Sequence, residues 1–107
     1  MYNVKINDYN LLESDPSDVI ALNTGKACIS RVLNISGING QVLKFKLSND
    51  GENWSYVQNE EGIADFEVTE DCAIPLLAFD CLFSIESDKD PTGITASIGI
   101  KRKGIKK

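Results

Sequence analysis

Histidine is absent from this chain of 107 residues, and its absence removes several familiar kinds of active site. Ser–His and Cys–His nucleophilic pairs need an imidazole as general base, and no serine is followed three positions later by lysine, so Ser-x-x-Lys catalysis has no motif either. The chain also lacks Gly-x-Gly-x-x-Gly and Gly-Lys-Ser/Thr, the loops that cradle phosphates. We therefore expect no enzyme and no cofactor.

Cysteine is scarce, since Cys28, Cys72 and Cys81 are an odd number with no close spacing. A disulfide framework needs an even, dense set, and a zinc site needs Cys-x-x-Cys pairs or histidines. We predict buried or half-buried thiols in a reducing compartment and no metal site. A Cys72–Cys81 bridge stays open as an alternative.

Long apolar runs are lacking as well. None approaches the roughly 20 residues that cross a bilayer, and the first six residues hold no basic segment followed by an apolar one, as a secretory signal would. We expect no membrane association and synthesis in a cytoplasm.

Positive charge is rare outside the C-terminus. Residues 1–100 carry six basic and sixteen acidic groups, a net charge of 6 − 16 = −10. Such an acidic body repels phosphate backbones, so we expect no nucleic-acid-binding surface across the domain. The basic tail is either a solvated extension that protects a sheet edge or a contact to a partner. It consists of Lys101, Arg102, Lys103, Lys106 and Lys107.

Turn-forming residues occur at short intervals, and apolar side chains alternate with polar ones between them. Leu43, Phe45 and Leu47 share one strand face, opposite Lys44 and Lys46, and such a period of two with one wet face is typical of antiparallel sheets. We predict a single all-β domain over residues 1–107, an antiparallel immunoglobulin-like β-sandwich of about seven to eight strands with a basic extension from about 101. The expected strands are about 2–6, 18–22, 26–36, 41–48, 53–58, 63–69, 79–86 and 93–102.

Two residues interrupt this pattern. Arg31 falls on the apolar face of the strand at 26–36, and we expect it at the sandwich rim with its head in water. Pro75 splits the apolar segment from 72 to 86, which predicts an edge strand or crossover followed by a core strand.

Asn49-Asp50-Gly51 is the sharpest local signal in the chain. Glycine adopts a positive φ at little cost, and Asn or Asp side chains bond the backbone of their own turn. Asp50 and Glu52 are a fragment of a calcium loop, which needs more oxygen ligands at regular spacing. We interpret the segment as a plain turn.

Trp54 and Tyr56 are two positions apart and therefore project from one face of a strand. If that face is packed, they join Phe45, Phe66 and Phe83 in the core, which is where a single tryptophan usually lies. If it is exposed, they form a platform on which a sugar ring can stack. The sequence leaves both alternatives open.

Three segments resemble elements of small bacteriophage virion proteins, the β-sandwich decoration, auxiliary or fibre-associated components. The first is the hairpin at 45–54 with its Ser-x-Asp-Gly-x-x-Trp element, Ser48-Asn49-Asp50-Gly51-Glu52-Asn53-Trp54. The others are Phe79-Asp80-Cys81-Leu82-Phe83-Ser84-Ile85-Glu86, like a penultimate core strand, and Thr92-Gly93-Ile94-Thr95-Ala96-Ser97-Ile98-Gly99-Ile100-Lys101, like a closing strand. The turn element also resembles discoidin-like sugar-binding domains, which are longer.

The resemblance implies assembly and no catalysis. It suggests a structural protein of a virus particle that is made in the host cytoplasm, contacts other capsid or tail proteins, and forms a homo-oligomer. Many such proteins carry a long extended arm, whereas this chain has only the short basic tail. The alternative function is a small carbohydrate-binding module that uses Trp54 and Tyr56.

Overall fold

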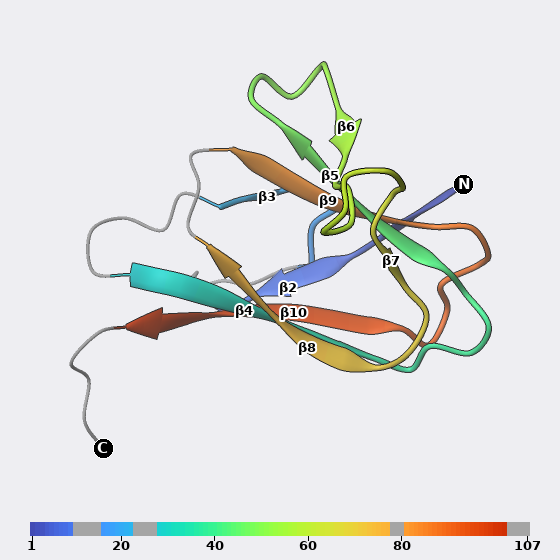
Figure 1. Cartoon of the computed structure of the whole chain (residues 1–107). Coiled ribbons are helices and arrows are strands. Elements are labelled where there is room, and N and C mark those ends of the chain that lie inside the picture. The colour runs from blue at the N-terminus through green and yellow to red at the C-terminus, as the bar shows by residue number, and fades with distance from the viewer. Residues whose placement is uncertain (10–15, 23–27, 78–80, 103–107) are drawn as a thin grey trace.

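The computed structural model describes residues 1–9, 16–22, 28–77 and 81–102 (Figure 1). Ten strands form in these ranges, and no helix long and apolar enough to cross a membrane occurs among them. The strands are β1 (Tyr2–Val4), β2 (Ile6–Asp8), β3 (Ile20–Ala21), β4 (Cys28–Ser36), β5 (Leu43–Ser48), β6 (Ser55–Tyr56), β7 (Glu67–Val68), β8 (Cys72–Leu77), β9 (Leu82–Ser87) and β10 (Thr95–Arg102).

The strands build two sheets that lie face to face (Figure 1). The six-stranded sheet has the order β1-β9-β5-β6, with β3 also paired to β9 and β7 to β5, and the four-stranded sheet has the order β2-β10-β4-β8. The pairing is antiparallel throughout except between β2 and β10, which run parallel. The predicted all-β sandwich is therefore confirmed, with two more strands than the eight expected ranges.

The core lies between the sheets and follows the predicted alternation. The four-stranded sheet contributes Ile6, Leu33 and Ile98, which are fully buried, and the six-stranded sheet contributes Phe45 and Phe83. The two phenylalanine rings meet edge to face with centroids 5.4 Å apart. Each such side chain stabilises the fold by about 1.5–3 kcal/mol through its removal from water.

Two further aromatic side chains lie at the margin of the core or outside it. Phe66 packs against it only partly buried, with its ring centroid 5.4 Å from that of Phe45. Trp54 lies outside it, half-buried on the outer side of the six-stranded sheet. Of the two positions that the sequence left open for Trp54, the structure shows the outer one, because Trp54 and the neighbouring Tyr56 of β6 lie against the lysine face of β5.

The N-terminal segment divides between the sheets. The sequence predicted one strand at about 2–6, but β1 pairs with β9 in one sheet and β2 pairs with β10 in the other. Val4 and Ile6 are both buried with exposed Lys5 between them. Both neighbours of Lys5 therefore reach the same core from opposite sheets.

Pro75 lies in β8, at an edge of the four-stranded sheet, as the sequence predicted. An edge strand needs hydrogen bonds on one side only, so a residue without an N–H is tolerated there. The core strand that follows, β9, begins at Leu82. Its expected start at about 79 lies outside the described residues.

Arg31 is not at a wet rim. Its side chain is 5% exposed, and its Nη1 lies 3.2 Å from Oδ2 of Asp8, whose side chain is equally buried. The same Nη1 donates to the backbone carbonyl of Ala21 at 2.9 Å. The expected exposed head is therefore wrong, because the four-stranded sheet places a carboxylate beside Arg31 inside the sandwich and the other sheet offers it a carbonyl.

Two strands are much shorter than expected. The ranges 53–58 and 63–69 contain only β6 and β7, of two residues each. Both pair with β5, and between them the chain forms a hairpin in which Asn59 N donates to Ala64 O. The hairpin carries Gln58 and Asp65 back over the outer side of β5.

Candidate binding face on the six-stranded sheet

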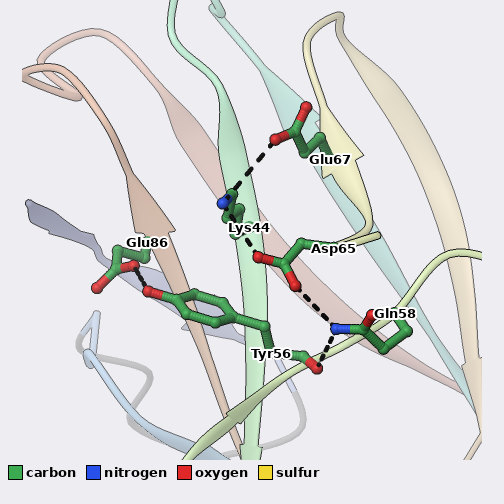
Figure 2. Close-up of polar contacts among 6 residues, drawn as sticks. All are labelled: Lys44, Tyr56, Gln58, Asp65, Glu67 and Glu86. Carbon is green, nitrogen blue, oxygen red and sulfur yellow. Dashed lines mark hydrogen bonds and ion pairs between the residues drawn. The ribbon is translucent and has the colours of Figure 1, made fainter. Parts of the chain in front are cut away.

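Charged and aromatic side chains from β5, β6 and β9 lie together on the outer face of the six-stranded sheet. Because side chains alternate along a strand, the positions between the buried residues of β5 and β9 point away from the core. Lys44 stands opposite Glu86, and Lys46 stands opposite both Ser84 and Tyr56. Strand pairing thus brings these side chains into one patch, part of which is drawn in Figure 2.

Tyr56 and Lys46 both bind the Glu86 carboxylate. The Tyr56 hydroxyl donates to Oε1, and Lys46 Nζ lies 3.4 Å from Oε2 (Figure 2 shows the tyrosine contact). The carboxylate raises the pKa of the Tyr56 phenol. Partial burial alone would raise the pKa of Glu86, but the hydrogen bond from Tyr56 and the charge of Lys46 outweigh it and lower that pKa.

Lys44 is held between two acids. Its Nζ lies 3.1 Å from Oδ2 of Asp65 and 3.9 Å from Oε2 of Glu67 (Figure 2). The bond to Asp65 raises the pKa of Lys44 and lowers the pKa of Asp65, whose other oxygen accepts from Gln58 Nε2 at 2.8 Å. Gln58 therefore ties the β6–β7 hairpin to the lysine of β5.

The turn at 48–53 positions Trp54. Gly51 has φ +81°, and the Asp50 carboxylate accepts the backbone N–H groups of Glu52 and Asn53, both at 2.9 Å. These hydrogen bonds hold the pKa of Asp50 far below its ordinary value. The predicted turn is therefore present, and the carboxylate of Asp50 accepts hydrogen bonds from the turn's own N–H groups.

The two aromatic rings lie partly open on this face. Tyr56 is 36% exposed and Trp54 is half-buried, with its indole N–H donating to the carbonyl of Gly51 at 3.3 Å. Lys44 Nζ lies 5.3 Å from the tyrosine ring centroid, and Lys46 Nζ lies 5.7 Å from the tryptophan ring. These cation–π contacts hold the rings against the sheet.

Chemically, this arrangement suits recognition. The rings offer flat surfaces for stacking, while the acid, amide and ammonium groups beside them can exchange hydrogen bonds with a polar ligand. The described residues contain no group of three or more His, Cys, Asp or Glu side chains placed to hold a metal ion. A shallow depression of about 210 Å³ beside the 48–53 turn is lined by Ala21, Asn49, Asp50, Cys81 and Leu82.

The sequence singled out only Trp54 and Tyr56 of this patch. Its signal for Lys44 and Lys46 was their place on the wet face of β5, but Glu86, Gln58 and Asp65 come from other segments. Their convergence depends on strand pairing, which the sequence does not specify.

The other predicted positions are only partly described. Lys101 and Arg102 belong to the end of β10, whereas Lys103, Lys106 and Lys107 lie outside the described residues. No disulfide joins Cys72 and Cys81, which are both half-buried, so the alternative of a bridge between them is not realised. Burial raises the pKa of Cys72, which lowers the reactivity of its thiol.

No family model matches this chain, and no curated protein and no solved structure matches it either. The functional argument therefore depends on the residues and contacts described above.

Proposed function

We propose that this protein is a non-catalytic structural component of a virus particle, a capsid decoration, auxiliary or tail- or fibre-associated protein that acts through protein–protein contacts. One observation supports it above others. The segments that resemble such virion proteins occupy the centres of both sheets, where β5 pairs with β9 over six positions and β10 lies between β2 and β4. The segments that carry the resemblance thus include the central strands of both sheets.

Charge distribution suggests how the protein attaches. The body of residues 1–100 has a net charge of 6 − 16 = −10, whereas five of the last seven residues are basic. The basic tail then meets acidic surface on another copy or on a capsid or tail protein. Such contacts steer association and weaken as salt rises.

Binding to purified particles tests this proposal. The full chain should co-sediment with particles from which the native copies have been stripped, and removal of residues 103–107 should weaken binding most at low salt. A matched variant, Lys5→Ala, removes an exposed cation that does not belong to the tail and should bind normally. Failure of the full chain to bind stripped particles at any salt concentration would overturn the proposal.

Carbohydrate binding is the second candidate, favoured by the position of Trp54 and Tyr56 on an outer face rather than in the core. A glycan array should show binding that Trp54→Ala abolishes and Tyr9→Ala leaves unchanged, because Tyr9 is an exposed aromatic outside this patch. An array without signal, or with signal insensitive to Trp54→Ala, removes this candidate.

A further inference from the structure

Two dipeptides of this chain, Asn39-Gly40 and Asp50-Gly51, have the composition that favours closure of a succinimide ring. In this spontaneous reaction the backbone nitrogen of a residue attacks the side-chain carbonyl carbon of the asparagine or aspartate before it. Glycine is the most favourable second residue, because no Cβ hinders the approach of its nitrogen. Nowhere else in the sequence does glycine follow an asparagine or an aspartate. The structure places the two pairs in different surroundings.

The Asp50-Gly51 pair is protected by its own turn. Oδ1 of Asp50 accepts the backbone N–H groups of Glu52 and Asn53, and Oδ2 accepts Nδ2 of Asn53 at 2.8 Å. The nitrogen of Gly51 donates to Oγ of Ser48 at 2.8 Å. The hydrogen bonds to its oxygens keep the pKa of Asp50 far below its ordinary value, and an ionised carboxylate is a poor target for a nucleophile.

The Asn39-Gly40 pair has no such protection. It lies in the turn between β4 and β5, and both residues are exposed. Among the described residues, neither the side-chain amide of Asn39 nor the N–H of Gly40 has a hydrogen-bond partner. A Cβ added to Gly40 would meet nothing within 4 Å, so the space beside it is open. The two reacting groups are therefore free to meet.

We propose that Asn39 is a site of spontaneous deamidation in the folded protein, whereas Asp50 is kept from the corresponding isomerisation. The nitrogen of Gly40 loses its proton to a base in the solvent and forms a bond to Cγ of Asn39. The bond from Cγ to the side-chain nitrogen breaks, and that nitrogen takes a proton from solvent and leaves as ammonia. Water then opens the ring at either carbonyl and yields an aspartate or an isoaspartate. In sum, one amide and one water become one carboxylic acid and one ammonia, without any oxidant or cofactor.

The isoaspartate product disturbs contacts that tie two turns together. The side chain of Gln41, which is 6% exposed, accepts the N–H of Asn39 at 2.6 Å and donates to the carbonyl of Asp90 at 2.9 Å. Lys89 Nζ donates to the carbonyl of Gly40 at 3.2 Å. An isoaspartate inserts one methylene into the main chain between these groups, so the contacts cannot all keep their geometry. We expect this form to unfold at a lower urea concentration than the unmodified chain.

Incubation of the full folded chain in mildly alkaline buffer tests the proposal, because the attacking nitrogen must lose its proton. Peptide mapping by mass spectrometry, with fragmentation that distinguishes aspartate from isoaspartate, follows positions 39 and 50, and an ammonia assay follows the leaving group. Asn39→Gln is the matched control, since it keeps an amide at the same exposed position but would have to close a larger ring. The wild type in urea is the second control, because unfolding removes the hydrogen bonds around Asp50 and Gly51.

The expected result is that Asn39 deamidates in the folded protein at least about tenfold faster than any other asparagine among the described residues, a difference of about 1.4 kcal/mol in barrier. Most of the ammonia release should be lost in Asn39→Gln, and Asp50 should isomerise faster in urea than in the fold. An Asn39 that stays intact in the folded protein overturns the inference, and so does an Asp50 that isomerises equally fast folded and unfolded. The inference goes beyond the proposed function, because particle binding and deamidation are measured separately and either can fail alone.

Discussion

Removing one partner of the buried Arg31–Asp8 ion pair should destabilise this protein far more than replacing both. The two side chains are each 5% exposed and their charged atoms lie 3.2 Å apart. Arg31 also donates to the carbonyl of Ala21 in β3, so it connects the two sheets. Its Nε is buried with no hydrogen-bond partner among the described residues.

The magnitude follows from the cost of a buried charge. Asp8→Val keeps a strand-forming side chain in β2 but leaves the guanidinium without its carboxylate, which typically costs about 3–5 kcal/mol. Whole domains are stable by only about 5–15 kcal/mol. For a chain of this length the loss corresponds to a fall in Tm of roughly 10–25 °C.

The double variant Asp8→Val/Arg31→Met removes both charges and should recover most of that loss, because apolar replacement of a buried ion pair is often neutral or stabilising. Urea unfolding followed by circular dichroism measures all three variants, with Arg31→Met completing the cycle. We expect a coupling energy of about 2–3 kcal/mol. A loss below about 1 kcal/mol for Asp8→Val, or a double variant no more stable than the single ones, would refute the reasoning.

Three further predictions concern the turns and the outer face. The pKa of Asp50 is lowered in the fold, so its stabilising contribution is present above its unfolded pKa of about 3.9 and is lost as pH falls toward the folded value. The stability of Asp50→Ala should therefore fall less steeply with decreasing pH than that of the wild type in acid unfolding curves. Glu86→Gln should lower the pKa of Tyr56 toward its ordinary value in an absorbance titration of the phenols, and an unchanged titration would contradict the contact. Gly37→Ala should destabilise more than Gly40→Ala in urea, since both have positive φ but only at Gly37 would the Cβ meet a backbone carbonyl, at 2.1 Å; equal losses would mean that the carbonyl moves aside.

Local patterns predicted most of the framework. Alternation along 41–48 and 93–102 identified β5 and β10 and their buried faces. A strand with one solvent-exposed face has apolar residues at every second position, because successive side chains point to opposite sides. The missing N–H of Pro75 predicted an edge strand or a crossover, and the structure shows the edge strand. The Asn49-Asp50-Gly51 turn was equally local, since its hydrogen bonds are made within a few residues.

The candidate site was much less predictable. The sequence left open whether Trp54 is buried or exposed, and it did not connect Glu86, Asp65 and Gln58 with it, because these residues come from segments that meet only through pairing with β5. Arg31 was misplaced for the same reason. Nothing near it in the chain indicates that Asp8, 23 residues away, lies beside it in the interior.

The sequence by itself determined that this chain forms sheets, which face of each long strand is apolar, and that the body is acidic with a basic end. These properties depend on each residue's own chemistry and on near neighbours. Only the tertiary structure decided which strands pair, where the chain passes from one sheet to the other, and which charged side chains meet on the outer face of the six-stranded sheet. Side chains distant in sequence become neighbours only through strand register, and register is settled by the packing of the whole core.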